Sequence, residues 1–136
     1  MLFRSGLVVG SSSGPTGTHA VLWNNASIQD LGTLGGPFSE ASSINNAGVV
    51  VGASTTSLGG RAFVWTSATG MQDLNSLIPS SSGVVLTGAL GINDNGQIVA
   101  IGVVNIDTAH MVELDDPHHA GPTHQFLLTP SGGPLR

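Results

Sequence analysis

Two neighbouring stretches decide the fold: Ile44-Asn45-Asn46-Ala47-Gly48-Val49-Val50-Val51-Gly52 and Arg61-Ala62-Phe63-Val64-Trp65. Both are short, are rich in valine and aromatic residues, and are bounded by glycine and asparagine, which is typical of β-strands separated by tight turns. The turn lies at Asn46-Ala47-Gly48, since Asn and Gly tolerate the positive φ that a hairpin needs. We therefore predict a unit of antiparallel strands around this turn.

The chain repeats this unit three times. The glycine that opens the valine-rich strand recurs as Gly6, Gly48 and Gly96, and the tryptophan of the next strand recurs as Trp23 and Trp65. Gly6 and Gly48 are 42 positions apart, as are the two tryptophans, whereas Gly48 and Gly96 are 48 apart. Four short antiparallel strands at this spacing match one blade of a β-propeller, whose period is roughly 40–45 residues.

The predicted fold is all-β: three consecutive four-stranded antiparallel blade-like repeats, a partial β-propeller, with almost no helix. Within one repeat domain, 1–136, we place repeats at about 6–40, 41–87 and 88–130, an insertion at about 105–120 and a tail at 131–136. We expect the first repeat to lack its first strand and the last repeat to lack its last. Three blades are too few to close the usual ring of roughly 4–8. The arc could be part of a larger propeller, be closed by a second chain, or have its last blade completed by a strand from the N-terminus.

Composition narrows the class of partner. Asp, Glu, Lys and Arg make up only 8% of the chain and the formal net charge is -5, so the basic surface that binds nucleic acid is missing. No apolar run approaches the roughly 18 residues that span a membrane, and cysteine is absent. The first ten residues lack the features of a signal peptide. We expect either an intracellular chain or a piece of a longer exported protein.

A family resemblance rests on four motifs in their order along the chain. These are Gly-x-Val-Val-Gly, His-Ala-x-x-Trp from His19 to Trp23, Asp-Leu-Gly-Thr-Leu-Gly-Gly at residues 30–36, and Ser-x-x-Ile-Asn-x-x-Gly ending at Gly48. Together they resemble the HAF-family extracellular repeat of bacterial exported proteins, and residues 71–130 resemble its last repeats. The resemblance implies an extracellular or cell-surface location and no catalytic residue. Leu128 departs from the pattern, standing where the first two repeats have tryptophan.

Residues 105–120 interrupt the repeat. The valine-strand glycine and the start of the next strand are 13 positions apart in two repeats, and 28 apart between Gly96 and His124. The insertion carries carboxylates and imidazoles, which can bind a divalent cation. The weak candidate ligands are Glu113, Asp115, Asp116, His118 and His119, beside His110. A solvated surface loop is the favoured alternative, since charged residues of a charge-poor chain gather on exposed loops. No other cofactor is predicted.

Three other motifs have structural interpretations that we favour. Residues 10–14 satisfy G-x-S-x-G, but a second strand follows them instead of the helix of a nucleophile elbow, so we assign them to a loop between two strands. Asn93-Asp94-Asn95-Gly96 faintly resembles a calcium loop and is better explained as a hairpin turn. Trp23 and Trp65 could stack on sugars, but their matched positions favour packing between repeats.

A candidate ligand face is formed by His19, Arg61 and His124, which begin equivalent strands in the three repeats. The first functional hypothesis is a non-enzymatic extracellular repeat domain for binding or assembly, whose partner is the chain itself, further repeats of a longer chain, or a glycan or protein ligand. The second is a metal-dependent binding or enzymatic domain that uses residues 105–120. The third is a propeller fragment without independent function.

For the solvated-loop interpretation we expect no stabilisation by metal ions. Adding Ca²⁺, Zn²⁺ or Mn²⁺ to about 1 mM should leave the melting temperature unchanged, because only an ion that binds the folded state shifts it. The control is the variant with Asp115, Asp116 and His118 changed to alanine, measured in parallel. A rise in melting temperature that this variant loses would instead establish a metal site in the insertion.

Overall fold

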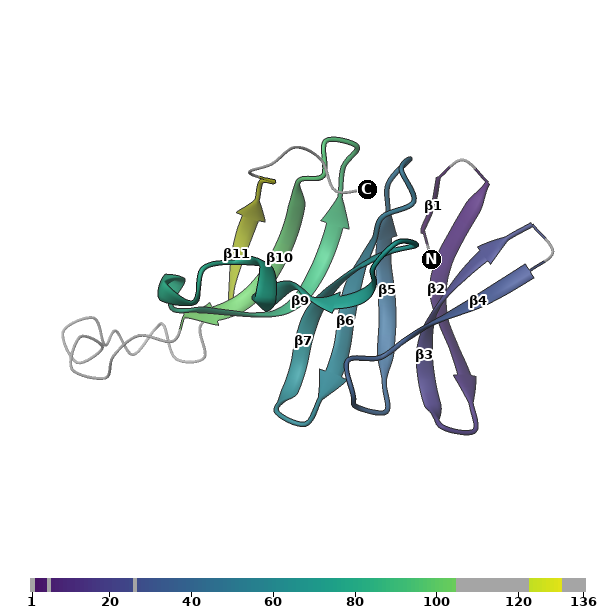
Figure 1. Ribbon diagram of the computed structural model, residues 1–136, viewed down its shortest axis with the longest axis horizontal. Coiled ribbons are helices and arrows are strands. Elements are labelled where there is room, and N and C mark those ends of the chain that lie inside the picture. Colours follow the sequence, from purple (N-terminus) through teal and green to yellow (C-terminus); the bar gives the residue numbers. More distant parts are fainter. Residues whose placement is uncertain (1, 5, 26, 105–122, 131–136) are drawn as a thin grey trace.

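The computed structural model describes residues 2–4, 6–25, 27–104 and 123–130. They form three antiparallel sheets that lie side by side, with the second sheet in the middle (Figure 1). The only helical elements among the described residues are two short 3₁₀ segments, η1 (Leu74–Leu77) and η2 (Ser80–Ser82). No described helix is long and apolar enough to cross a membrane. The all-β prediction is confirmed.

Each sheet follows the chain order of its strands. The first sheet contains β1 (Leu2–Arg4), β2 (Leu7–Gly14), β3 (Gly17–Asn24) and β4 (Ser27–Gly32). The second contains β5 (Ser39–Ile44), β6 (Val50–Thr56), β7 (Gly59–Thr66) and β8 (Gly70–Asp73). The third contains β9 (Val84–Ile92), β10 (Ile98–Val104) and β11 (Thr123–Leu128).

One part of the strand prediction is wrong. The first sheet has its first strand, because β1 pairs with β2 in the register Leu2↔Val9 and Arg4↔Leu7. The tight turn between them places Gly6 at φ 82°, as Gly48 is placed in the second sheet. Sequence reasoning missed β1 because it is only three residues long and lacks the Ile-Asn pair that ends β5. Within the described residues the third sheet has three strands, as expected.

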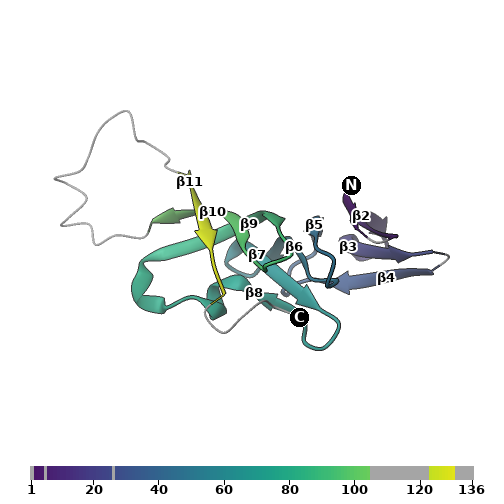
Figure 2. The ribbon, with the colours of Figure 1, turned by 90° about the horizontal axis from the view of Figure 1, so that it is seen from above.

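The second sheet is buried on both faces. Along β7 successive side chains point to opposite faces. Ala62 and Val64 belong to the core shared with the third sheet, whereas Phe63 and Trp65 belong to the core shared with the first. The packing repeats along the molecule, since β5 contacts β1, β2 and β3, and the equivalent strand β9 contacts β5, β6 and β7 (Figures 1 and 2).

A polar contact joins the hairpins of the second and third sheets. The Asn45 side chain is 1% exposed. Its Oδ1 accepts from the backbone N–H groups of Ala47 and Val49, both at 3.0 Å, and its Nδ2 donates to the Asn93 carbonyl at 3.1 Å. Asn46 donates from its backbone and side chain to the Asp94 carboxylate, both at 2.8 Å. The predicted turns at residues 45–48 and 93–96 are confirmed.

Asn45 and Asn93 occupy equivalent turns but differ in burial, which gives a matched pair of variants. Asn45→Ala should lower the free energy of unfolding by roughly 1–3 kcal/mol, because it leaves the buried Val49 N–H without its side-chain acceptor. Asn93→Ala should cost roughly 1 kcal/mol or less, since water can replace the bonds of its exposed side chain. Urea denaturation of both variants measures the difference. Equal losses would contradict the role of Asn45 as a buried link between sheets.

Candidate functional site

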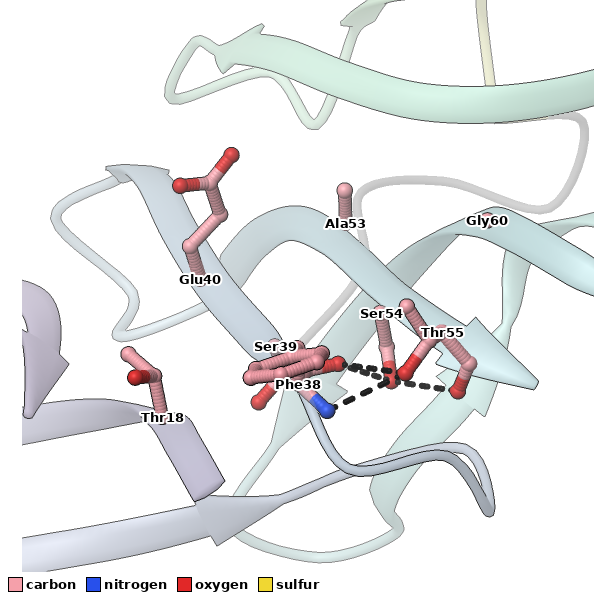
Figure 3. Close-up of a pocket in the computed structure, with 8 residues that line it drawn as sticks. All are labelled: Thr18, Phe38, Ser39, Glu40, Ala53, Ser54, Thr55 and Gly60. Carbon is pink, nitrogen blue, oxygen red and sulfur yellow. Dashed lines mark hydrogen bonds between the residues drawn. The ribbon is translucent and has the colours of Figure 1, made fainter. Parts of the chain in front are cut away.

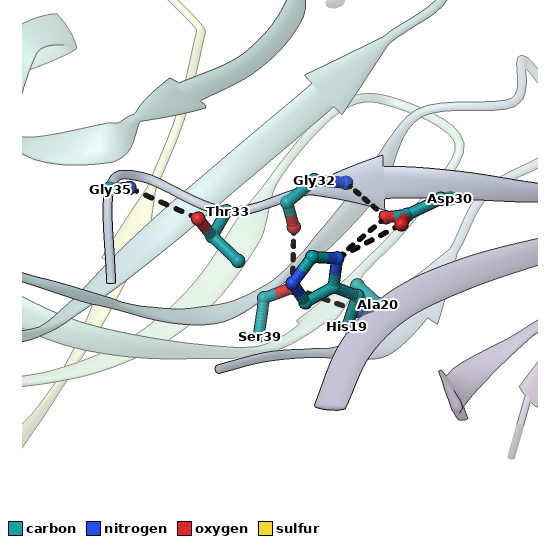
Figure 4. Close-up of polar contacts among 7 residues, drawn as sticks. All are labelled: His19, Ala20, Asp30, Gly32, Thr33, Gly35 and Ser39. Carbon is teal, nitrogen blue, oxygen red and sulfur yellow. Dashed lines mark hydrogen bonds and ion pairs between the residues drawn. The ribbon is translucent and has the colours of Figure 1, made fainter. Parts of the chain in front are cut away.

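The polar cluster around His19 and Asp30 lies in the first sheet (Figure 4). His19 Nδ1 lies 2.9 and 3.1 Å from the two carboxylate oxygens of Asp30, on the neighbouring strand. Asp30 Oδ1 also accepts from the backbone N–H of Gly32 at 2.8 Å. The Gly32 N–H, and after it the His19 side chain, lower the pKa of Asp30 below its ordinary value. The cluster holds Asp30 in its ionised form.

The motif at residues 30–36 crosses from the first sheet to the second. Ser39 of β5 accepts from the Ala20 N–H at 2.8 Å and donates to the Gly32 carbonyl at 2.6 Å, so a buried hydroxyl links the two sheets. Gly36 donates its N–H to the Thr55 carbonyl at 2.9 Å. A Cβ at Gly36 would collide with the Thr55 side chain. Close approach of the backbone to β6 therefore requires this glycine.

Ser12, His19 and Asp30 have the residue types of a hydrolase triad. Ser12 is the register partner of His19, so both side chains are on one face of the sheet. Within the described contacts, however, no hydrogen bond joins them. Residues 10–14 lie in the continuous strand β2, and strand β3 follows after a turn. The assignment of residues 10–14 to a loop is therefore wrong, because all five lie in β2; a second strand does follow them, as expected, and a nucleophile elbow is not formed.

The second repeat shows what the aspartate does. Asp73, the counterpart of Asp30, accepts from the backbone N–H of Asn75, two residues on, at 2.9 Å. The corresponding bond of Asp30 also reaches the residue two positions on. The counterpart of His19, however, is Arg61, whose Nη1 donates to the Gly60 carbonyl at 2.7 Å. An aspartate that accepts from the backbone N–H two residues on is thus common to both repeats, whereas its histidine partner occurs in one.

The three residues of the candidate ligand face have separate neighbours. His19 contacts Asp30, Arg61 contacts Gly60, and the ring of His124 lies 6.3 Å from that of Phe126 between centroids. Arg61 and His124 lie on the face of their own sheet that packs on the preceding sheet, whereas His19 lies on the outer face of the first sheet. The described contacts do not bring the three together, and their joint role in binding stays a prediction.

A pocket of about 270 Å³ lies between the ends of the first two sheets (Figure 3). Its residues are Thr18, Phe38, Ser39, Glu40, Ala53, Ser54, Thr55 and Gly60. The Phe38 backbone bonds to the hydroxyls of Ser54 and Thr55, so these polar groups already hold the connection between sheets. The exposed Phe38 ring and the Glu40 carboxylate are left to meet a ligand. Sequence reasoning missed this pocket because Phe38 lies outside the repeated motifs.

The two tryptophans of the repeat differ in burial. Trp65 is buried in the core between the first and second sheets, as predicted. The prediction of packing between repeats is wrong for Trp23, which is half-buried on the outer face of the first sheet, where no described repeat covers it.

The weak metal candidates Glu113, Asp115, Asp116, His118 and His119 lie outside the described residues, as does His110. Among described residues, no group of three or more acidic or histidine side chains could hold a metal ion.

Comparisons of the chain with protein-family models, with curated proteins and with solved structures found no match. The HAF-repeat resemblance therefore rests on the sequence motifs alone and stays a prediction. The architecture of three stacked antiparallel sheets is shown by the structure itself.

The lowered pKa of Asp30 predicts how the stability of the fold depends on pH. Its folded-state pKa is lowered, so its contribution to stability is present above the unfolded-state pKa and is lost as pH falls through the folded-state value. Near neutral pH, Asp30→Ala should lower the free energy of unfolding by on the order of 1 kcal/mol, as expected for an exposed charge-assisted bond. The deficit relative to wild type should shrink below about pH 4.

Chemical denaturation at several pH values measures this deficit. Glu40→Ala serves as the control, because it removes an exposed carboxylate from β5 of the second sheet, away from the His19–Asp30 cluster. A deficit for Asp30→Ala that does not change with pH would mean that the carboxylate charge contributes nothing.

Proposed function

We propose that this chain is a non-enzymatic repeat domain, in which the three sheets act as blades of a partial propeller that serves in binding or assembly. The observation that carries the proposal is the equivalence of the two interfaces between sheets. Val9, Ala20 and Leu22 of the first sheet pack toward the second. Their counterparts Val51, Ala62 and Val64, each 42 positions later, pack toward the third. One packing scheme is thus used twice.

The repeated motifs support the same proposal because their residues have structural roles. Asp30 accepts from the Gly32 backbone at the end of β4, Gly36 permits a close approach, and Ser39 and Asn45 satisfy buried backbone groups. A residue that holds the fold needs no catalytic explanation. The HAF-repeat resemblance adds the proposal that the domain works at the cell surface or outside the cell. For a glycan or peptide ligand, the pocket offers the exposed aromatic ring of Phe38, and Glu40 also belongs to its lining.

The triad-like residues on the first sheet are the one observation that favours an enzyme. Against it, Ser12 and His19 are not hydrogen bonded, and Ser12 sits on an extended strand. A nucleophilic serine also needs donors that stabilise the oxyanion, which such enzymes take from the strained turn and the helix after it. In this chain another strand follows.

A fluorophosphonate probe, which reacts with activated serines, separates the two classes. We expect no labelling of the folded chain and no hydrolysis of p-nitrophenyl esters above the buffer rate. Ser12→Ala and His19→Ala should behave as the wild type does. Stoichiometric labelling that is lost in Ser12→Ala and reduced in His19→Ala, but kept in the matched variant Ser54→Ala, would overturn the non-enzymatic proposal.

A further inference from the structure

The third sheet ends the described arc with an uncovered apolar face. Val99 of β10 and Leu127 of β11 are register partners, so their side chains are adjacent on one face of the sheet. They are 38% and 65% exposed. No residue that projects from this face in β10 and β11 is charged. The residues are Val99, Ile101, Val103, Thr123, Gln125 and Leu127.

The same pair of positions is covered in the second sheet. Val51 and Val64 are register partners and occupy the places of Val99 and Leu127 in the repeat. They are 0% and 1% exposed, because the third sheet packs on them. The uncovered face of the third sheet is therefore the continuation of an interface that the molecule already forms twice.

The complementary face is present on the first sheet. In the second sheet, Val50, Trp65 and Met71 form a row across β6, β7 and β8 that packs on the first sheet. The equivalent row of the first sheet contains Val8, Trp23 and Ile28. Ile28 is 54% exposed and Trp23 is half-buried. This row has no sheet of the described chain in front of it.

We propose that the outer face of the third sheet binds the outer face of the first sheet in a second copy of this chain. The proposal rests on the proposed function, because it takes the sheets to be equivalent blades. The two rows would meet as the rows of neighbouring sheets meet within one chain, with Leu127 of one copy near Val8 and Trp23 of the other. Such a contact joins two different surfaces, so it builds a closed ring or an open chain of copies.

Sedimentation across roughly 1–100 µM protein tests the association, a range that covers moderate interface affinities. We expect copies to associate as concentration rises. Leu127→Glu should weaken the association by roughly tenfold or more, since it removes a leucine from the interface and places a charge there. The matched control is Leu58→Glu, at an 80% exposed leucine in the turn between β6 and β7, which should associate as wild type does.

Cross-linking tests the orientation, because the chain has no cysteine of its own. Leu127→Cys and Val8→Cys chains, mixed and oxidised, should form the mixed disulfide in preference to either homodimer. Predominant Leu127→Cys homodimers would overturn the head-to-tail arrangement, and a monomer at all concentrations would overturn the association. Neither result would involve serine labelling, so failure here is distinguishable from failure of the non-enzymatic proposal.

Discussion

The structure depends on the burial of the second sheet on both faces. A strand places alternate side chains on opposite faces, so a sheet with neighbours on both sides must be apolar at consecutive positions. Val49, Val50 and Val51 meet that requirement, and all three are fully buried. A sheet with one solvent-exposed face would need polar side chains at alternate positions. Because this run is apolar throughout, the second sheet can pack in the same way on each side. The first and third sheets repeat the pattern, and each has one neighbouring sheet among the described residues.

Polar links determine how far apart and in what register the sheets lie. Burying a backbone N–H without a partner costs more than the bond itself contributes, so each connection must supply acceptors at fixed points. Ser39 supplies one to Ala20 in the first interface, and Ser43 of the same strand supplies one to Ile92 at 3.3 Å in the second interface. Among the described residues, no buried side-chain polar atom lacks a partner. Apolar contact gives the sheets affinity, and these hydroxyls give them alignment.

Repeat spacing and turn chemistry were sufficient to predict most strands and the hairpins at Asn45 and Asn93. The same reasoning could not predict β1, because three residues carry no measurable periodicity. It placed the turn after β2 too early, because serine is compatible with both strand and loop.

The burial of individual side chains was less predictable than the positions of the strands. Trp23 and Trp65 hold matched positions in the repeat, yet among the described sheets only Trp65 has one in front of it. What covers a residue is decided by the neighbouring repeat, which local sequence does not encode. The pocket beside Phe38 was missed for a similar reason, since its lining combines one connection with strand residues that are far apart in sequence.

Repetition also changes how the polar residues of the first sheet are interpreted. Taken alone, Ser12, His19 and Asp30 would suggest chemistry, and a lowered carboxyl pKa would strengthen that impression. The second repeat provides an internal comparison: Ser54, Arg61 and Asp73 hold the same positions, and the aspartate accepts the same backbone hydrogen bond from the residue two positions on. The second repeat keeps the serine and the aspartate but has arginine in place of the histidine. A catalytic role would therefore have to depend on the histidine alone. The repeated residues are best understood as parts of the fold, and the functional question moves to the surfaces that the repeat leaves uncovered.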